Sequence, residues 1–214
     1  MKYTYSNEKI SSKIFEFTYM CAMRDAILRE AFKGEKTWVE NVTGAKVMLR
    51  KYIDKVLNND FDSQDNHDKY LLEIANEICK AINEERPQNA IAIFSFGNAQ
   101  KLINMTVKYV YAFCYQNPDL RVGFRYCHCP LDSIMLNKVW KWCEDHYGGS
   151  NRRREILGRS DDFLKPWGNE GTKNEFQPIL IEFPKRYSLF QKAVKDLIDQ
   201  GDIYPIEFDY MEWK

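Results

Sequence analysis

The sequence lacks the long apolar runs and the charge imbalance that would bring a protein to a membrane or to nucleic acid. No stretch approaches the roughly 18 consecutive apolar residues of a membrane span, and the N-terminal MKYTYSNEKISSK contains no apolar signal-peptide run. Lysine plus arginine and aspartate plus glutamate number 31 each, so no overall field attracts an anionic partner. We therefore expect a cytoplasmic protein without membrane contact, whose electrostatic preferences are local.

The sequence also lacks the short motifs of common nucleotide and hydrolase sites. It contains no P-loop, G-x-G-x-x-G, H-E-x-x-H or G-x-S-x-G pattern. Histidine, whose ordinary pKa suits proton transfer near neutral pH, occurs only at His67, His128 and His146. These absences leave nucleoside triphosphatases, dinucleotide oxidoreductases and standard hydrolases without support, and we expect no cofactor.

The six cysteines predict neither disulfides nor a metal site. Four of them fall on or near apolar helical stripes, where a free cysteine behaves as a small hydrophobic residue. Side chains at consecutive extended positions point apart, which disfavours joint metal binding by Cys127, His128 and Cys129. A site closed by Cys127, Cys129, Cys143 and His146 is the alternative, and a reduced chain without metal is the expectation.

Helical periodicity fills most of the chain, with apolar residues recurring at spacings of three and four. Among shorter segments, AIAIFSF is ambiguous between a strand and a helix lead-in, and ILIEF is typical of a short strand. The region 148–178 has the composition of a long irregular connection, and 202–214 that of an extended tail. The prediction is a mainly α single domain over 1–214, with room for a short two-stranded β element near the C-terminal half. Its helices are expected at about 11–32, 37–59, 65–85, 97–115, 130–149 and 185–200.

The segment GNAQKLINMTVKYVY, residues 97–111, predicts a helix whose polar face has no carboxylate. From Arg86 to Leu131 the only acid is Asp119. Lysines, amides and a tyrosine ring on one rigid face suit a phosphate or carboxylate and a stacked base. Alternatively, the lysines pair with acids of neighbouring helices and the amides tie down a loop. The candidate ligand-binding residues are Gln100, Lys101, Asn104, Lys108, Tyr111, Arg121 and Arg125.

The stretch RYCHCPLDS supplies the candidate acid–base residues. His128 precedes a helix start expected at Pro130, and Asp132 falls in the first helical turn. In the functional interpretation His128 transfers protons and Asp132 orients it. In the structural interpretation Asp132 is a helix-start residue and His128 is a hydrogen-bonded corner.

Two resemblances bear on this region. Arg121 and His128, with six residues between them, resemble the R-x4-6-H signature of helical HEPN-type ribonucleases, although Pro118, Gly123 and Pro130 favour turn or extended structure here. The set AQKLINMTVKY, HCPLD and PIEFDYMEW resembles an uncharacterised family of bacterial proteins over the second half of the chain. That second resemblance implies that one unit contains Gln100, Lys101, Asn104, Lys108, His128 and Asp132, and it identifies no reaction.

The sequence therefore discloses no reaction of its own. The hypothesis is a helical protein that binds an anionic ligand, a nucleotide or RNA phosphate, with a metal-independent ribonuclease or nucleotide-processing activity as one form of it. The alternative is a non-catalytic interaction module that docks a protein partner through the aromatic residues of KVWKWCEDHY and FDYMEWK.

Overall fold

The computed structural model describes residues 9–25, 39–40, 42–88, 93–146, 149, 180–198 and 203–212. Within these ranges the chain is mainly helical, as the periodicity predicts, and contains no strand. The elements are α1 (Ser12–Met23), α3 (Thr43–Asn58), α4 (Gln64–Glu84), α5 (Phe96–Cys114), α6 (Pro118–Arg121), the 3-10 helix η2 (Val122–Tyr126), α7 (Ser133–His146), α10 (Lys185–Ile198) and α11 (Pro205–Glu212). No helix among the described residues combines the length and the apolar character that crossing a bilayer requires.

Local signals set where several helices begin and end. Ser63 caps α4 by accepting a hydrogen bond of 3.2 Å from the backbone N–H of Asn66. Ser95 and Asn98 form a capping box at the start of α5. Asn59 ends α3 with a left-handed φ of 58°, a conformation that asparagine tolerates better than most residues.

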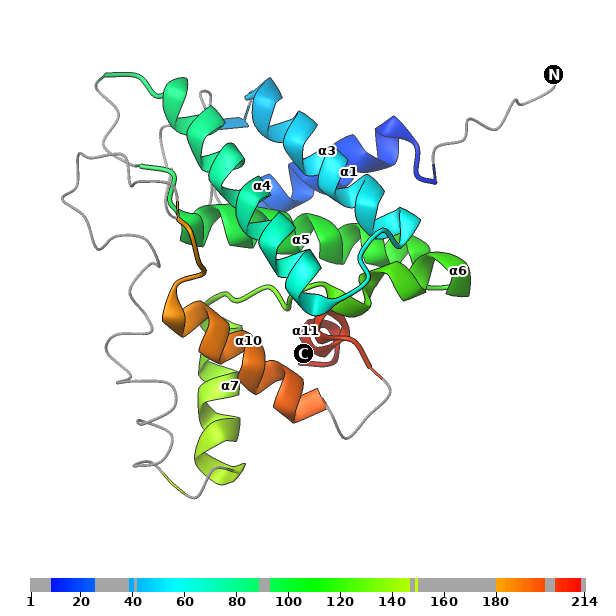
Figure 1. Ribbon diagram of the computed structural model, residues 1–214, viewed down its shortest axis with the longest axis vertical. Helices are drawn as coiled ribbons and strands as arrows, with labels where there is room; N and C mark the ends of the chain where they lie inside the picture. Colours follow the sequence, from blue (N-terminus) through cyan, green and yellow to red (C-terminus); the bar gives the residue numbers. More distant parts are fainter. Residues whose placement is uncertain are drawn as a thin grey trace.

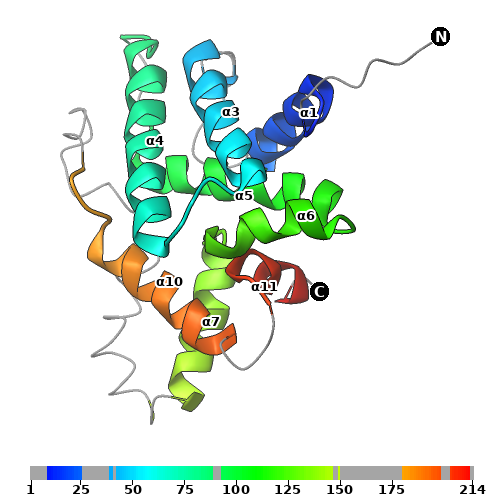
Figure 2. The same ribbon diagram turned by 45° about the vertical axis from the view of Figure 1, so that its right-hand side comes forward.

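Helix α5 lies at the centre of the molecule (Figures 1 and 2). Helices α1, α3 and α4 lie on one side of it, and α7, α10 and α11 on the other. Its side chains Leu102, Ile103, Val107 and Val110 have no exposed surface and belong to a buried cluster that draws residues from both sides. Because most of both sides of α5 is covered, the polar residues that it buries must find partners inside the protein.

The segments expected to form a β element pair with side chains of α4 instead of with each other. The amide of Asn76 bonds both backbone groups of Leu180, at 3.1 Å to its N–H and 2.8 Å to its carbonyl. Asn83 does the same for Phe94, at 2.9 and 2.8 Å. A side-chain amide thus replaces the neighbouring strand, and the predicted short β element is wrong for the described residues.

Three boundary predictions also need correction. The segment 118–126, expected as turn or extended structure, forms α6 and η2. The expected extended tail contains α11, which begins at a proline because a first helical turn needs no N–H there. Helix α7 begins at Ser133 rather than at Pro130. The predicted connection 148–178 lies, apart from Gly149, outside the described residues.

Candidate functional site

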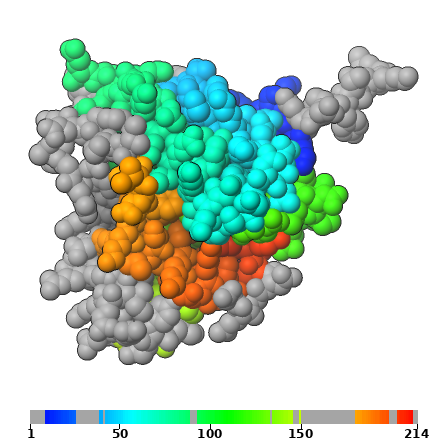
Figure 3. Space-filling model, in the orientation of Figure 1, coloured from blue at the N-terminus to red at the C-terminus, as the bar shows by residue number. Residues whose placement is uncertain are grey.

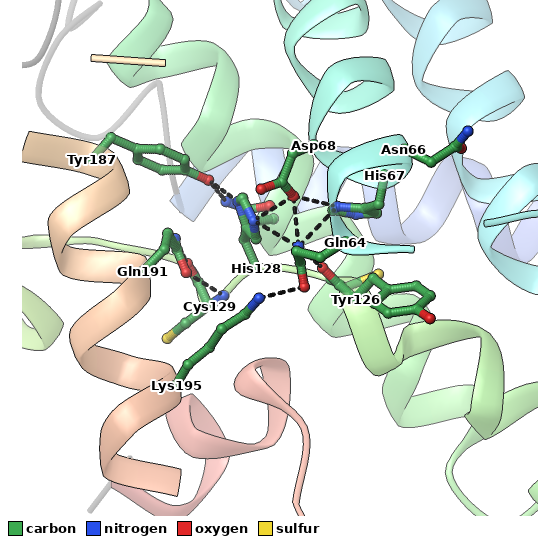
Figure 4. A network of polar contacts seen from close by, with 12 residues as sticks. Gln64, Asn66, His67, Asp68, Tyr126, His128, Cys129, Tyr187, Gln191 and Lys195 are labelled. Atoms are coloured by element: carbon green, nitrogen blue, oxygen red, sulfur yellow. Dashed lines mark hydrogen bonds and ion pairs between the residues drawn. The ribbon is translucent and has the colours of Figure 1, made fainter. Parts of the chain in front are cut away.

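A polar cluster forms where the first turns of α4 meet the extended segment that follows η2. Gln64, His67 and Asp68 lie on one face of α4, because positions i, i+3 and i+4 of a helix are neighbours. His128 comes from the extended segment and Lys195 from α10. Figure 4 shows these side chains pointing toward one another, and Figure 3 shows the surface where α4 and α10 are in contact. We call Gln64, His67, Asp68 and His128 the His–Asp–His cluster.

One carboxylate oxygen joins the two imidazoles. Asp68 Oδ1 lies 2.9 Å from His67 Nδ1 and 3.0 Å from His128 Nε2. These three atoms, all of metal-binding type, lie within 4.8 Å of one another. His67 is fully buried and His128 is 3% exposed, whereas the Asp68 side chain is 31% exposed. The cluster therefore reaches solvent through its carboxylate.

A tyrosine hydroxyl holds the outer nitrogen of each imidazole. Tyr52 lies on α3 and its hydroxyl is 2.7 Å from His67 Nε2. Tyr187 lies on α10 and its hydroxyl is 2.7 Å from His128 Nδ1. Because both hydroxyls are buried and burial raises the pKa of each tyrosine, they remain protonated. Both rings are thus oriented by neutral partners from different helices.

The protonation states of the α4 pair suit metal coordination. Burial lowers the pKa of His67 to about 4, against a smaller opposing effect of the Asp68 hydrogen bond, so the imidazole is neutral near pH 7. Burial raises the pKa of Asp68, but hydrogen bonds from His128, His67 and Gln64 outweigh it and hold the pKa well below its usual range. A neutral imidazole and an ionised carboxylate are the forms that bind metal ions.

The amide of Gln64 occupies the remaining side of the cluster. Its Nε2 lies 2.6 Å from Asp68 Oδ1, 3.3 Å from His128 Nε2 and 3.5 Å from His67 Nδ1. Its Oε1 accepts a hydrogen bond from the ammonium of Lys195. The amide is therefore enclosed by metal-type ligands on one side and by a cation on the other.

The extended segment that carries His128 is fixed by a third amide clamp. The N–H of Cys129 donates to Gln191 Oε1 at 3.1 Å, and Gln191 Nε2 donates to the Cys129 carbonyl at 2.8 Å. Both residues are buried. Helix α10 thus positions the segment through Gln191 and the His128 ring through Tyr187.

Two of the predicted α5 residues connect to this cluster. Asn104 is fully buried, and its Nδ2 donates to Gln100 Oε1 and to the Tyr187 hydroxyl, both at 3.2 Å. Gln100 in turn donates to the Leu131 carbonyl at 3.3 Å. The structure therefore brings Gln100, Asn104 and His128 into one hydrogen-bonded unit. The alternative role of tying down a loop is confirmed for Gln100, whereas Asn104 contacts a side chain of α10.

Two further polar residues of the α5 face, Lys108 and Tyr111, are covered by α11. The ammonium of Lys108 pairs with Asp209, and the two side chains are only 4% and 7% exposed. The Tyr111 hydroxyl donates to the buried Glu207. The acids missing from the local sequence are thus supplied by α11. Lys108 as an anchor for an external anion is wrong, because a buried carboxylate already neutralises it.

Arg121 and Asp132 form contacts that stabilise the fold. Arg121 Nη2 donates to Glu207 Oε1 at 2.8 Å, so Arg121 pairs with a carboxylate while the described partners of His128 are Asp68, Gln64 and Tyr187. This separates the two residues of the ribonuclease-like signature into different clusters. Asp132 accepts from the N–H of Met135 at 2.9 Å, which confirms it as the residue that starts α7.

The two other candidate cations lie apart from these contacts. Arg125 donates to the Phe61 carbonyl at 3.3 Å and lies 4.6 Å over the Tyr126 ring. Lys101 is half-buried on α5. Two aromatic residues expected on a docking surface, Trp140 and Phe208, are buried in the core.

The residues that group as possible metal ligands in the structure differ from the cysteine and histidine set that the sequence suggested. Cys127, Cys129 and Cys143 are buried, and burial raises the pKa of Cys127 to about 12 and that of Cys129 well above its usual value. The side chain of His146 lies outside the described part of the chain. Among the described residues the grouping of metal-ligand type is His67, Asp68 and His128.

Sequence reasoning missed Gln64, His67 and Asp68 because they have the ordinary composition of a polar helix start. The one available signal is a histidine followed by an acid, three residues after a glutamine, before an apolar stripe. Comparison with protein-family models, with curated proteins and with solved structures finds no match to this chain. The resemblance to a bacterial family stays a prediction.

Proposed function

We propose that this protein binds a divalent transition-metal ion between His67, Asp68 and His128. The observation that carries the proposal is the convergence of two imidazole nitrogens and one carboxylate oxygen within 4.8 Å, from segments 60 residues apart in the chain. Two histidines and one carboxylate form a ligand set used for catalytic zinc and for non-haem iron. Such a set leaves coordination positions open for water or substrate.

Gln64 borders the fourth corner of this site, the position left open for water or substrate. Ligand atoms about 2.1 Å from a tetrahedral ion are roughly 3.4 Å from one another. The Gln64 amide nitrogen lies 2.6 to 3.5 Å from the three ligand atoms, so the amide is next to the place that an ion would occupy. Its oxygen accepts from Lys195, so the amide N–H groups face this corner and would donate to a water or substrate atom held there.

The tyrosine partners accommodate both the metal-free and the metal-bound states. In the metal-free state each hydroxyl donates to an imidazole, and the opposite ring N–H donates to Asp68. When the inner nitrogens bind an ion, the outer ring N–H of His67 donates to Tyr52 and that of His128 to Tyr187. Metal-binding histidines usually have such an outer partner. Only protons need to move.

The solvent side of the cluster suits hydrolysis of an anionic substrate. Asp68 is partly exposed there, and the half-buried Lys195 contributes a positive charge next to Gln64. A bound Zn²⁺ lowers the pKa of a coordinated water to about 7 and so supplies a nucleophile. A nucleotide or RNA phosphate thus remains the proposed substrate class, with Lys195 as its cation in place of Lys108.

The first test measures metal binding directly. We expect chelator-treated protein to bind Zn²⁺ or Co²⁺ in calorimetric titration with one ion per chain. Asp68→Asn should lower the affinity by more than about 10-fold, because even the loss of a partner outside the ligand shell costs 10- to 100-fold. The matched control is Asp132→Asn, which changes a carboxylate that caps α7 and should leave the affinity unchanged. Equal affinities for the two variants would refute the site.

A second candidate is metal-independent acid–base chemistry by the same two histidines. The observation that favours it is that all four ring nitrogens already have a hydrogen-bond partner without an ion. Hydrolysis of a fluorogenic RNA oligonucleotide separates the two cases. Activity that a chelator abolishes and Zn²⁺ or Mn²⁺ restores supports the metal site, whereas activity that survives the chelator and is lost in His128→Ala supports the histidine pair.

A further inference from the structure

A recess lies at the C-terminal end of α5 and shares no residue with the His–Asp–His cluster. It has a volume of about 480 Å³ and is bounded by α5, α6 and α11, which lie together in Figure 2. Recesses of a few hundred cubic ångströms are typical of small-molecule sites. The side chains that decide its chemistry are Tyr111, Tyr115, Tyr210, Arg121 and Glu207.

The floor of this recess is polar but close to electrically neutral. Glu207 is 7% exposed, and its Oε1 accepts from Arg121 at 2.8 and 3.1 Å and from the Tyr111 hydroxyl. Its Oε2 accepts from the backbone N–H of Tyr204 at 2.8 Å. Both carboxylate oxygens are therefore satisfied, and the guanidinium balances their charge. A floor of this kind favours a neutral ligand over a strongly charged one.

Arg121 keeps donor capacity for a ligand. Its hydrogen bonds with described residues involve Nε and Nη2, and its side chain is 34% exposed. A guanidinium has five N–H donors in a planar fork. The terminal nitrogen Nη1 therefore suits an acceptor such as a ligand carbonyl.

The walls include three tyrosine rings that lie close to one another. The ring centroids of Tyr115 and Tyr210 lie 5.7 and 6.2 Å from that of Tyr111, at interplanar angles of 72° and 41°. Tyr115 is 56% exposed, so much of its surface is free for contact, and the Arg121 guanidinium lies 5.8 Å over its ring. Stacking of a base on an aromatic side chain is favourable for any base, because every base has a π face.

We propose that this recess binds the nucleobase of a nucleoside, with its ring against the tyrosines and a ring carbonyl at Arg121. Aromatic walls, a neutral floor and a spare guanidinium donor together match a neutral heterocycle that carries a carbonyl. The proposal does not depend on the metal site, because the two sites have no residue in common.

The test is calorimetric titration of the full chain with inosine, which has a ring carbonyl, and with adenosine, which has an amino group at the same position. We expect saturable binding of inosine and weaker binding of adenosine. Tyr115→Leu should lower the inosine affinity by about 10-fold, as loss of one stacking face does. The matched control is Phe113→Leu, which changes an exposed aromatic residue in the last turn of α5 that does not line the recess, and the inosine affinity of this variant should be unchanged.

Further titrations test whether the phosphate contributes to binding and whether the recess binds independently of the metal site. Binding of inosine monophosphate equal to that of inosine indicates that the recess does not recognise the phosphate, and tight binding of the monophosphate without binding of inosine overturns the proposal. Inosine affinity should be the same in chelator and in Asp68→Asn, whatever those conditions do to metal binding. Absence of saturable inosine binding at millimolar concentration, or an equal loss in Tyr115→Leu and Phe113→Leu, also overturns it.

Discussion

Among single residues, Lys108 shows most clearly how burial changes the meaning of a charged side chain. Its ammonium pairs with Asp209, lies 4.9 Å over the Tyr210 ring and has only 4% of the side chain exposed. Burial raises the pKa of Asp209, and Lys108 opposes that shift. Lys108 therefore neutralises Asp209 inside the protein instead of binding an external anion. Removing the ammonium would leave the charge of the buried Asp209 carboxylate without this counterion.

We expect Lys108→Met to lower the free energy of unfolding by about 3–5 kcal/mol, the usual cost of breaking a buried pair from one side. The matched control is Lys46→Met, which breaks the ion pair with Glu16, whose side chains are 25% and 51% exposed. That change should cost less than about 1 kcal/mol. Urea unfolding followed by circular dichroism measures both. Similar losses for the two variants would contradict the internal role of Lys108.

Among the elements, η2 is held against the end of α3 more tightly than any side chain permits. A Cβ atom on Gly123 would lie 1.9 Å from the backbone carbonyl oxygen of Val56. The neighbouring segment carries His128, so this close approach also sets where the histidine enters the cluster. This backbone contact explains why position 123 is a glycine, because only glycine lacks a Cβ atom.

Gly123→Ala should destabilise the protein by roughly 1–3 kcal/mol or more, because the backbones of η2 and α3 must separate. The control is Gly44→Ala in α3, where the added Cβ would lie 3.2 Å from the Ala81 side chain. There a gain in helix propensity of about 1 kcal/mol offsets the tight contact. Chemical unfolding compares the two. An unchanged stability in Gly123→Ala would show that η2 can move away from α3 at little cost.

For the whole molecule, the His–Asp–His cluster joins parts that local structure does not connect. Asp68 belongs to α4, His128 to the segment after η2, and their outer partners Tyr52 and Tyr187 to α3 and α10. An ion bound at the cluster would hold these elements together only in the folded state. Ligands that bind the native state alone raise stability by mass action.

Saturating Zn²⁺ should therefore stabilise the whole fold, by about 2.7 kcal/mol at a free concentration 100 times the dissociation constant. The measurement is the thermal midpoint of chelator-treated protein against Zn²⁺ concentration. The midpoint should rise with concentration and return when the chelator is added. Asp68→Asn should show no rise over the same range. A rise that this variant shares with the unchanged protein would place the ion elsewhere.

The sequence by itself determined the elements that depend on neighbouring residues. The apolar stripe of α4 and the polar residues at its start predict a helix, and Ser63 and the capping box at Ser95 and Asn98 set where α4 and α5 begin. The same local reasoning offered a helix start as one of its two interpretations of Asp132, and the hydrogen bond from Met135 bears that one out. These features depend on contacts three or four residues apart, which the order of the sequence contains.

Only the tertiary structure decided which polar residues meet. Gln64 and His128 are 64 residues apart, His128 and Tyr187 are 59 apart, and Tyr111 and Glu207 are 96 apart. The face of α5 without acids therefore looks like an anion site in the sequence and is an internal contact in the fold. The type of a residue determines which bonds its side chain can form. Burial and the partner that packing brings to it decide whether its charge is neutralised inside the protein or stays available to a ligand.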